Sequence, residues 1–264
     1  MRRTAILVIA ALNQPVYRHY IATYWTEMIR YTNAMTPDVD VFLLIQHDTP
    51  IEPFTHLGDN VIVDAETDLD RLMNPHHRRP GVPGITSKTI HALDVLAGEY
   101  DVFFRTNLSS LIRVGAFAEF VQSADDICYS GAWTWDDALR SDLVAQGWVG
   151  PGRIVEDLDE LDDYPGNTFI SGSGFFLSAD EAASLVARRE EVRYDITDDV
   201  TIGLMFDHHR GLPGVTTVVE PRLTVDEKMD RIRSASGFHI RLQHFPVEKA
   251  EELWRALEVE PLWR

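Results

Sequence analysis

Two adjacent carboxylates, Asp198 and Asp199, form the part of this sequence best suited to acid–base chemistry. They stand just before the apolar stretch 200–203, a pattern typical of the start of a helix. In a structural interpretation, Thr197 or Asp198 caps that helix by accepting backbone N–H bonds, and the negative charge suits the helix dipole. In a catalytic interpretation, one aspartate caps while its neighbour removes a proton from a hydroxyl within hydrogen-bond reach. The local sequence supports both.

A second set of residues is suited to anion binding, because positive charge gathers near the end of the chain. The basic residues of this set are Arg222, Lys228, Arg231, Arg233 and Arg241. They are either solvated charges or part of a flexible loop that folds over a diphosphate. His239 and His244 flank the basic strand predicted there. The pairs His76-His77 and His208-His209 lack the spacing of a metal site and are expected on the surface or in loops.

Polar residues follow several predicted strands, where the chain leaves the sheet. They are Asn13, Asp64, Asn107 and Ser109. Ligands of parallel α/β sheets gather at the carboxyl ends of the strands, so these side chains are expected at one edge. The segment Ser171-Gly172-Ser173-Gly174 interrupts another apolar strand. Glycine there marks either a bulge or a close approach of a ligand to the backbone, and the sequence favours neither.

The elements that would position these residues alternate between strand and helix. We predict strands at 4–12, 39–45, 61–63 and 100–105, and helices at 17–31 and 84–98. Continuous apolar strands between helices predict an α/β fold with a mainly parallel or mixed sheet covered on both faces. The second half is less regular. There we predict strands at 126–130, 169–178, 215–219 and 238–243, and helices at 179–189 and 246–257, all within one domain.

Composition narrows the class of protein. The chain has 264 residues, a formal net charge of −18 and 45% hydrophobic residues, enough for a packed core. Such a charge disfavours broad binding to nucleic acid or anionic membranes. The apolar segment after Arg3 is interpreted as a buried strand rather than a signal peptide, and no run approaches the ~20 residues of a membrane span. Together with the single cysteine, Cys128, expected to be a buried thiol in a strand, this predicts a soluble, cytoplasmic protein.

Four blocks, taken in order, resemble the GT-A-fold glycosyltransferases, and most closely the inverting β1,3-galactosyltransferase and Fringe group. The first runs from Ile85-Thr86-Ser87-Lys88 through residues 100–109, and the second joins Tyr164-Pro165 to the glycine-rich segment 171–178. The third is residues 198–203, and the last is Phe238-His239. The resemblance covers roughly residues 60–245. No GxGxxG loop, P-loop or GxSxG elbow is present, which counts against dehydrogenases, P-loop NTPases and α/β-hydrolases.

The resemblance implies a single GT-A-like (Rossmann-like) domain over 1–264, with a nucleotide-sugar-binding half, 1–110, and an acceptor and catalytic half, 111–264. It also implies hexosyl transfer from a nucleotide-sugar, usually a UDP-sugar, to a glycan, a glycoconjugate or another hydroxyl acceptor. Asp199 becomes the base, with Asp198 beside it. The residues implied for the donor or diphosphate are Asn13, Asp64, Lys88, Arg105, Asn107 and Ser109. Those implied for close contact with donor or acceptor are Gly172, Ser173, Gly174 and Trp133, although burial explains the tryptophan equally well.

The metal motif is where the chain departs from this group. In place of its acidic triplet stands Asn107-Leu108-Ser109, which supplies only neutral oxygens. A divalent ion that bridges a diphosphate prefers anionic oxygen ligands. Two outcomes follow: a metal-independent enzyme whose basic C-terminal region neutralises the leaving UDP, or one that holds Mg²⁺ or Mn²⁺ weakly through His239 and the nucleotide.

Two other functions stay open at this point. The loss of the acidic triplet also suits a catalytically inactive protein that binds a nucleotide-sugar or a glycan. A metal-dependent hydrolase that uses the aspartates and histidines is the third alternative. The sequence leaves the oligomeric state undetermined.

Overall fold

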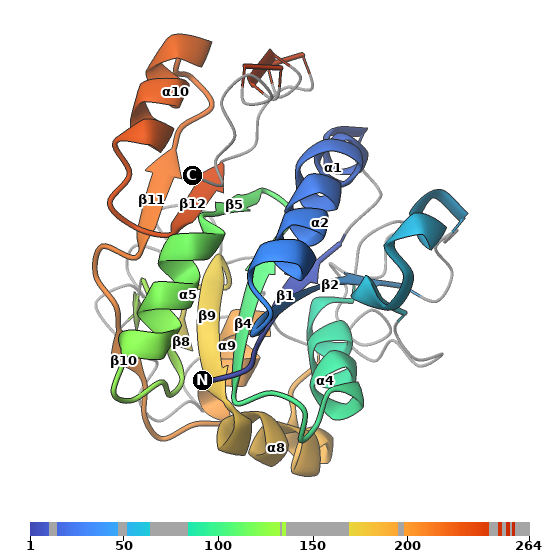
Figure 1. Ribbon diagram of the computed structural model, residues 1–264. Coiled ribbons are helices and arrows are strands. Elements are labelled where there is room, and N and C mark those ends of the chain that lie inside the picture. Colours follow the sequence, from blue (N-terminus) through green and yellow to red (C-terminus); the bar gives the residue numbers. More distant parts are fainter. Residues whose placement is uncertain are drawn as a thin grey trace, which may run out of the picture.

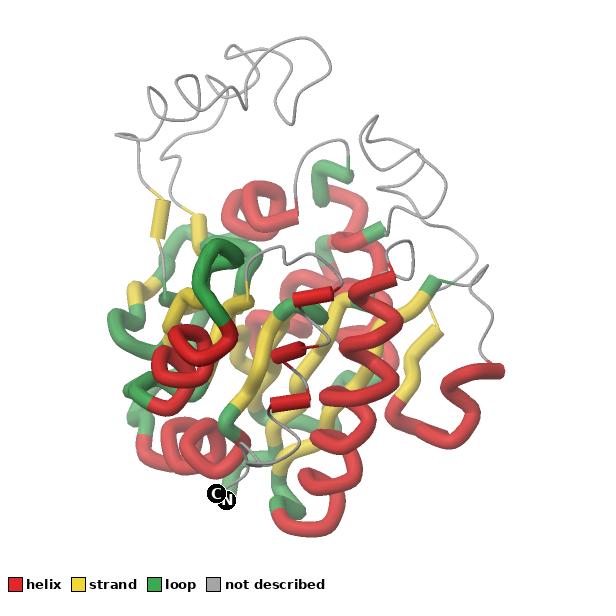
Figure 2. The backbone as a smooth tube through the Cα atoms, turned by 90° about the horizontal axis from the view of Figure 1, so that it is seen from above, coloured by secondary structure: helices red, strands yellow, loops and turns green. Residues whose placement is uncertain are grey.

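The computed structural model describes residues 1–10, 15–46, 52–63, 84–132, 134–135, 169–194 and 198–242, with 248–249, 252–253 and 255–256. A seven-stranded mixed sheet of order β10-β6-β9-β4-β1-β2-β3 forms the centre, and helices cover both of its faces (Figure 1). Viewed from above, the helices lie in two layers with the strands between them (Figure 2). The predicted α/β fold class is confirmed.

The parallel part of the sheet comes from the first half of the chain. It consists of β1 (Thr4–Ile9), β2 (Val39–Ile45), β3 (Val61–Val63) and β4 (Val102–Asn107). Against β4 runs the antiparallel β9 (Gly174–Ser178), followed outward by the short β6 (Ser130–Gly131) and β10 (Arg210–Gly211). One continuous sheet therefore contains strands from both predicted halves.

Two smaller sheets accompany the central one. A three-stranded sheet has the order β11-β12-β5, made of β11 (Thr216–Val219), β12 (His239–Leu242) and β5 (Ser110–Ile112). A two-stranded sheet pairs β7 (Thr134–Trp135) with β8 (Phe169–Ile170). Since β5 follows β4 almost at once, the three-stranded sheet starts at the carboxyl end of β4.

Strand β1 shows why the sheet needs two covering layers. All six residues of its sequence TAILVI are buried. Ile6 and Val8 join one hydrophobic core, whereas Ala5 and Leu7 join the other. Side chains alternate between the faces of a strand, so an apolar residue at every position requires a core on each side.

The helices divide between these two cores. The first core is covered by α1 (Pro15–Tyr20), a π-helical turn η1 (Ile21–Trp25), α2 (Thr26–Met35) and α5 (Val114–Ser123). The second is covered by α4 (Ile85–Val95), α8 (Ala179–Ala187) and α9 (Asp198–Leu204). The 3₁₀ segments η2 (Glu52–Asn60) and η4 (Arg189–Glu191) and the helix α10 (Val225–Arg233) complete the set of described helices.

Most predicted elements are present, and two need correction. The strand predicted at 126–130 is wrong except at its end, because β9 pairs with this segment only from Ser130 onward. The residue before it, Tyr129, donates its N–H to Oε1 of Glu181 at 2.8 Å instead of to a strand. The strand predicted at 169–178 is two strands in different sheets, with a turn at 171–173 between them. Cys128 therefore lies in a loop and is half-buried.

The ends of the chain add two observations. Of the helix predicted at 246–257, residues 248–249, 252–253 and 255–256 are described and are helical. Among the described residues, every helix is too short or too polar to traverse a lipid bilayer.

Candidate active site

The carboxyl end of β4 is where the structure gathers most of the predicted site residues. The turn between β8 and β9, the first turn of α9 and strand β12 all meet there. The pairing of β4 with β9 sets Thr106 opposite Gly174. Next to it, the pairing of β5 with β12 sets Ser110 opposite Arg241. Residues far apart in the sequence become neighbours through these two antiparallel pairings.

Asp199 lies in the first turn of α9 and is half-buried. Its Oδ2 accepts a hydrogen bond from the N–H of Gly172 at 3.1 Å, and its Oδ1 accepts one from the N–H of Val200 at 3.1 Å. Burial and the adjacent Asp198 raise the pKa of Asp199 from 3.8 to about 6, against the opposing effects of these hydrogen bonds and of Arg105. The carboxylate is thus fixed in place and is a stronger base than an ordinary aspartate.

Asp198 differs from its neighbour because it pairs with a buried cation. Its Oδ2 lies 2.5 Å from Nη2 of Arg105, whose side chain is 2% exposed. Arg105 also donates Nη1 to the carbonyl of Gly172 and lies over the ring of Phe175, 5.5 Å from its centroid. This ion pair fastens α9 to β4. Asp198 is the first residue of the helix, and Thr197, the other predicted cap, lies outside the described residues.

The end of β4 holds the turn between β8 and β9 through side chains. Asn107 donates Nδ2 to the carbonyl of Gly172 at 2.8 Å, and Thr106 donates Oγ1 to the carbonyl of Ser173 at 3.1 Å. The backbone carbonyl of Ser109 accepts a hydrogen bond from β12 at 2.8 Å. Asn107 and Ser109 therefore lie at the predicted edge.

The glycines of the segment 171–174 are needed for packing. A Cβ at Gly174 would lie 2.9 Å from Cε1 of His239, closer than Cβ atoms come in real proteins. A Cβ at Gly172 would lie 3.2 Å from Nη1 of Arg105. The sequence indicated that some group comes close to the backbone at these glycines, and in the structure that group is a protein side chain in each case. A ligand contact at these glycines or at Ser173 stays a prediction.

His239 is a core residue, and this arrangement does not fit the predicted metal contact. The residue is fully buried. Its Nδ1 lies 2.8 Å from Oγ1 of Thr216, and its Nε2 lies 2.9 Å from Oγ of Ser110 and 3.1 Å from Oγ1 of Thr106. Burial, and to a smaller extent Arg241, lower the pKa of His239 from 6.5 to about 3. The ring is therefore neutral, and each of its nitrogens lies within hydrogen-bond distance of a hydroxyl group.

The described residues at this edge do not fit a divalent metal ion. Asn107 and Ser109 carry neutral oxygens where a hard cation prefers carboxylates. The carboxylate of Asp198 is already paired with Arg105, and that of Asp199 accepts two backbone hydrogen bonds. Within the described part of the chain, this edge therefore supplies arginine cations rather than metal ligands.

Two buried arginine donors at this edge, Nε of Arg105 and Nη1 of Arg241, have no hydrogen-bond partner among the described residues. Burial and the Arg105 charge lower the pKa of Arg241, while Tyr17 and Asp198 act in the opposite direction. A guanidinium stays protonated even so. An anion that reaches Nη1 would therefore gain a charge-assisted hydrogen bond.

The other basic residues near the end of the chain have different surroundings. The predicted flexible loop is wrong for residues 225–233, which form α10. Lys228 is buried within this segment. Arg222 pairs with Glu220 at 2.5 Å. Arg231 and Arg233 lie exposed in the last turn of α10. Of the five, Arg241 is the one that reaches the end of β4.

Lys88, predicted to support the donor site, lies at the same edge. It comes from α4, is buried, and donates Nζ to the carbonyl of Ala10 at 3.2 Å. Ala10 directly follows β1, whose last residue, Ile9, pairs with Asn107. Three further predicted site residues, Asn13, Asp64 and Trp133, lie outside the described residues.

The sequence did not predict the hydroxyls that hold His239. Thr106, Ser110 and Thr216 come from β4, β5 and β11, and none stands in a recognisable motif. A signal was nevertheless present, because Thr106 follows soon after the apolar run Val102-Phe103-Phe104 and Ser110 directly precedes Leu111-Ile112. Buried polar groups need partners, so such positions indicate an internal hydrogen-bond network.

Comparison with known proteins finds likeness at the level of fold. No family model and no curated protein matches the chain. The galactosyltransferase LgtC, solved with donor and acceptor sugar analogues, is 12% identical with a TM-score of 0.48, over 96% of this chain and 95% of that one. A glycosyltransferase involved in glycosylation of the major capsid of PBCV-1 is 8% identical with a TM-score of 0.46, over 96% and 99%. The bifunctional WbbM is 13% identical with a TM-score of 0.48, over 98% of this chain and 50% of its own. Likenesses this distant say nothing of substrate or mechanism.

Proposed function

We propose that the protein is a glycosyltransferase that moves a sugar from a nucleotide-sugar, a UDP-sugar in particular, to a hydroxyl acceptor. The observation that carries the proposal is the geometry of Asp199. Its carboxylate is fixed by the Gly172 N–H at the carboxyl end of β4 and has a pKa raised to about 6. The ordered blocks that resemble inverting GT-A enzymes supply the reaction class, and ligands of α/β sheets bind at this edge.

In the proposed reaction, Asp199 acts as the general base. It takes the proton of the acceptor hydroxyl as the oxygen attacks the anomeric carbon. The bond between that carbon and the diphosphate oxygen breaks, and the nucleoside diphosphate leaves with the bonding electrons. Because its pKa is about 6, Asp199 is ionised at pH 7 yet retains useful basicity.

Arginine, rather than a metal ion, would balance the charge of the leaving group. Arg241 has a buried, unsatisfied donor beside the end of β4, and Lys88 lies at the end of β1. Positive charge placed in advance stabilises an anion that develops in the transition state. Arg105 takes the positioning role, because it holds Asp198 and the Gly172 carbonyl. The proposal predicts that chelation with EDTA leaves transfer intact.

The test is an Asp199→Asn variant assayed for sugar transfer from UDP-sugars to a panel of hydroxyl acceptors. Removing a general base lowers the rate by about 10²–10⁴-fold, while circular dichroism and the unfolding midpoint verify the fold. Asp180→Asn is the matched control, since Asp180 is an exposed aspartate in the first turn of α8. We expect it to keep the wild-type rate. Wild-type transfer by Asp199→Asn would disprove the assignment of the base.

A second candidate is a nucleotide-sugar or glycan binder without turnover. The observation in its favour is the absence of any carboxylate in Asn107-Leu108-Ser109. Calorimetric titration with UDP-sugars, run beside the product assay, separates the two functions. Tight binding with no product across the acceptor panel would favour the binder.

A further inference from the structure

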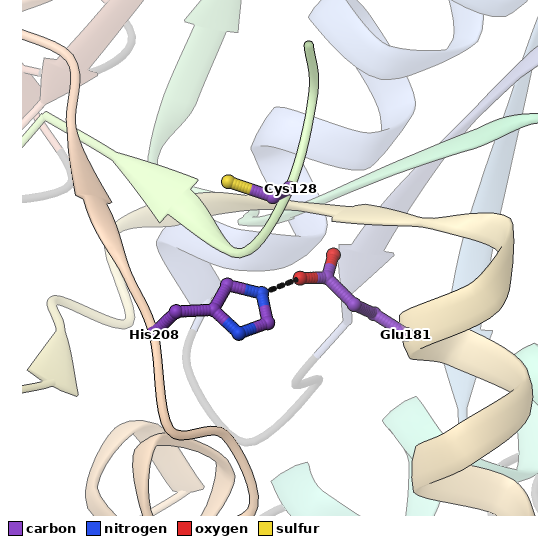
Figure 3. A group of neighbouring side chains, drawn as sticks. All are labelled: Cys128, Glu181 and His208. Carbon is purple, nitrogen blue, oxygen red and sulfur yellow. Dashed lines mark hydrogen bonds and ion pairs between the residues drawn. The ribbon is translucent and has the colours of Figure 1, made fainter.

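Three side chains from distant parts of the chain meet near Ser178, at the end of β9 that lies away from the candidate active site. Figure 3 shows these side chains. Cys128 comes from the loop before β6, Glu181 from the first turn of α8, and His208 from the segment between α9 and β10. One sulfur, one carboxylate oxygen and one imidazole nitrogen lie within 4.8 Å of one another. These are the donor types that bind zinc in proteins.

Glu181 is held rigidly in this cluster. Its Oε2 accepts hydrogen bonds from the N–H and the hydroxyl of Ser178 at 2.8 and 2.9 Å, within the capping box of α8. Its Oε1 accepts one from the N–H of Tyr129 at 2.8 Å. The same Oε1 lies 2.6 Å from Nε2 of His208, within hydrogen-bond distance. The carboxylate therefore keeps its position when His208 and Cys128 move.

The other two ligands are reachable from solvent. The side chain of His208 is 58% exposed, and Cys128 is half-buried. Burial, and after it the carboxylates of Glu181 and Asp126, raise the pKa of the Cys128 thiol, with Arg210 opposing them. Such surroundings make a poor free nucleophile.

We propose that Cys128, Glu181 and His208 bind a Zn²⁺ ion, with water as the fourth ligand. Thiolate and imidazole together select zinc or a similarly soft ion over Mg²⁺ or Ca²⁺. Zinc ligands at about 2.0–2.3 Å from the metal are about 3.3–3.6 Å from one another in a tetrahedron. The present separations need only small side-chain shifts: Nε2 of His208 moves off Oε1, and the thiol proton passes to solvent.

The position of the site indicates a structural role. Ser178, which caps the helix carrying Glu181, and Gly174, which packs beside His239, are the two ends of β9. Zinc would thus bind away from the proposed substrate site. It would join α8 to the segments that lead into β6 and β10, which pair over only two residues each at the edge of the sheet. Strands held by so few backbone hydrogen bonds gain the most stability from a cross-link.

Cobalt tests the ligand set directly. The untagged full-length chain is stripped of metal and titrated with Co²⁺, and the thiolate-to-cobalt charge-transfer band is followed in the near ultraviolet. We expect the band to saturate at one equivalent and to disappear when Zn²⁺ is added. Zinc should also raise the melting temperature by several degrees, because it binds the folded state.

Variants identify the ligands. Cys128→Ser should abolish the band, and His208→Ala should weaken Zn²⁺ binding at least about 10-fold. Glu181→Gln keeps a residue that can complete the capping box but loses the anionic ligand, so it should weaken binding while the helix stays folded. His209→Ala, a change at the exposed neighbour, should bind like wild type. A wild-type chain without the band, or a Cys128→Ser chain with undiminished zinc affinity, would overturn the proposal.

Discussion

Polar side chains are enclosed at one end of β9 and partly open to solvent at the other. At the Gly174 end, Arg105, Asp198 and His239 are enclosed, and protein groups occupy nearly all of their hydrogen-bonding atoms. At the Ser178 end, Glu181 is fixed but the Cys128 and His208 side chains remain reachable. The contrast shows that one sheet can carry an enclosed group of polar side chains at one end of a strand and a solvent-accessible group at the other.

Among the variants that test this contrast, Arg105→Met should cause the largest loss of stability. Asp198, whose side chain is 11% exposed, would lose its cation and remain a charge in a buried place. Breaking a buried ion pair from one side lowers the free energy of unfolding by about 3–5 kcal/mol. Urea denaturation followed by circular dichroism measures the loss.

The matching change at the other end of β9 is His208→Ala in the metal-free protein. The His208 side chain is 58% exposed, and Glu181 keeps its hydrogen bonds to Ser178 and Tyr129 when the imidazole is removed, so the loss should stay below about 1 kcal/mol. Equal losses in the two variants would contradict the contrast, because enclosure would then have no energetic consequence.

Gly174→Ala should give an intermediate effect. Its added Cβ would press on His239 and Phe104 at 2.9 Å, and overpacking of a filled core lowers the free energy of unfolding by about 1–3 kcal/mol. Gly115→Ala in α5 is the control, since a Cβ there meets nothing within 4 Å. The control should match wild type or exceed it by a few tenths of a kcal/mol. A tolerated Gly174→Ala would show that this end is less tightly filled than the structure indicates.

The pH dependence of stability tests the Gly174 end of β9 through the charge of His239. Folding lowers the pKa of His239 from 6.5 to about 3, so its contribution is present above pH 6.5 and is lost as the pH falls toward 3. Asp199 acts oppositely: its pKa is raised from 3.8 to about 6, so its contribution is present below pH 3.8 and is lost as the pH rises through about 6. A His239→Gln variant separates the two, because Asp199 contributes to both chains.

The measurement is the free energy of unfolding of wild type and His239→Gln between pH 7 and pH 4. Their difference should shrink as the pH falls, by at most about 1.4 kcal/mol per unit. A constant difference would mean that the folded state tolerates a charged imidazole, and that this end of β9 is more hydrated than its hydrogen bonds suggest.

Sequence patterns predicted the parallel core well because its signals are local. The apolar strands at 39–45 and 61–63 match the structure at both ends. The failures occur where partners are distant in sequence. Residues 126–130 alternate like a strand, yet β9 gives them a partner only from Ser130. Likewise, no local pattern joins His239 to Thr106, which lies 133 residues earlier.

The candidate site was predictable in its carboxylates but not in its surroundings. Asp198 and Asp199 stand out because two adjacent acids before an apolar stretch are conspicuous. Their different states depend on Arg105, which looks like one more strand residue until α9 packs against it. Of the proposed zinc ligands, the sequence predicted Cys128 as a buried thiol and His208 as a surface or loop residue, and it gave no signal for Glu181; only the fold brings the three together.

The place of β12 in the chain has a consequence for how the molecule is made. This strand, residues 239–242, lies between β11 and β5 and carries both His239 and Arg241. A ribosome releases it long after the strands β1 to β4 have emerged. Until then, the hydroxyls of Thr106 and Ser110 lack their imidazole partner. A nascent chain can therefore assemble its parallel sheet early, but it closes the end of β4 only after residues 239–242 have emerged, which leaves that edge for chaperones to shield until then.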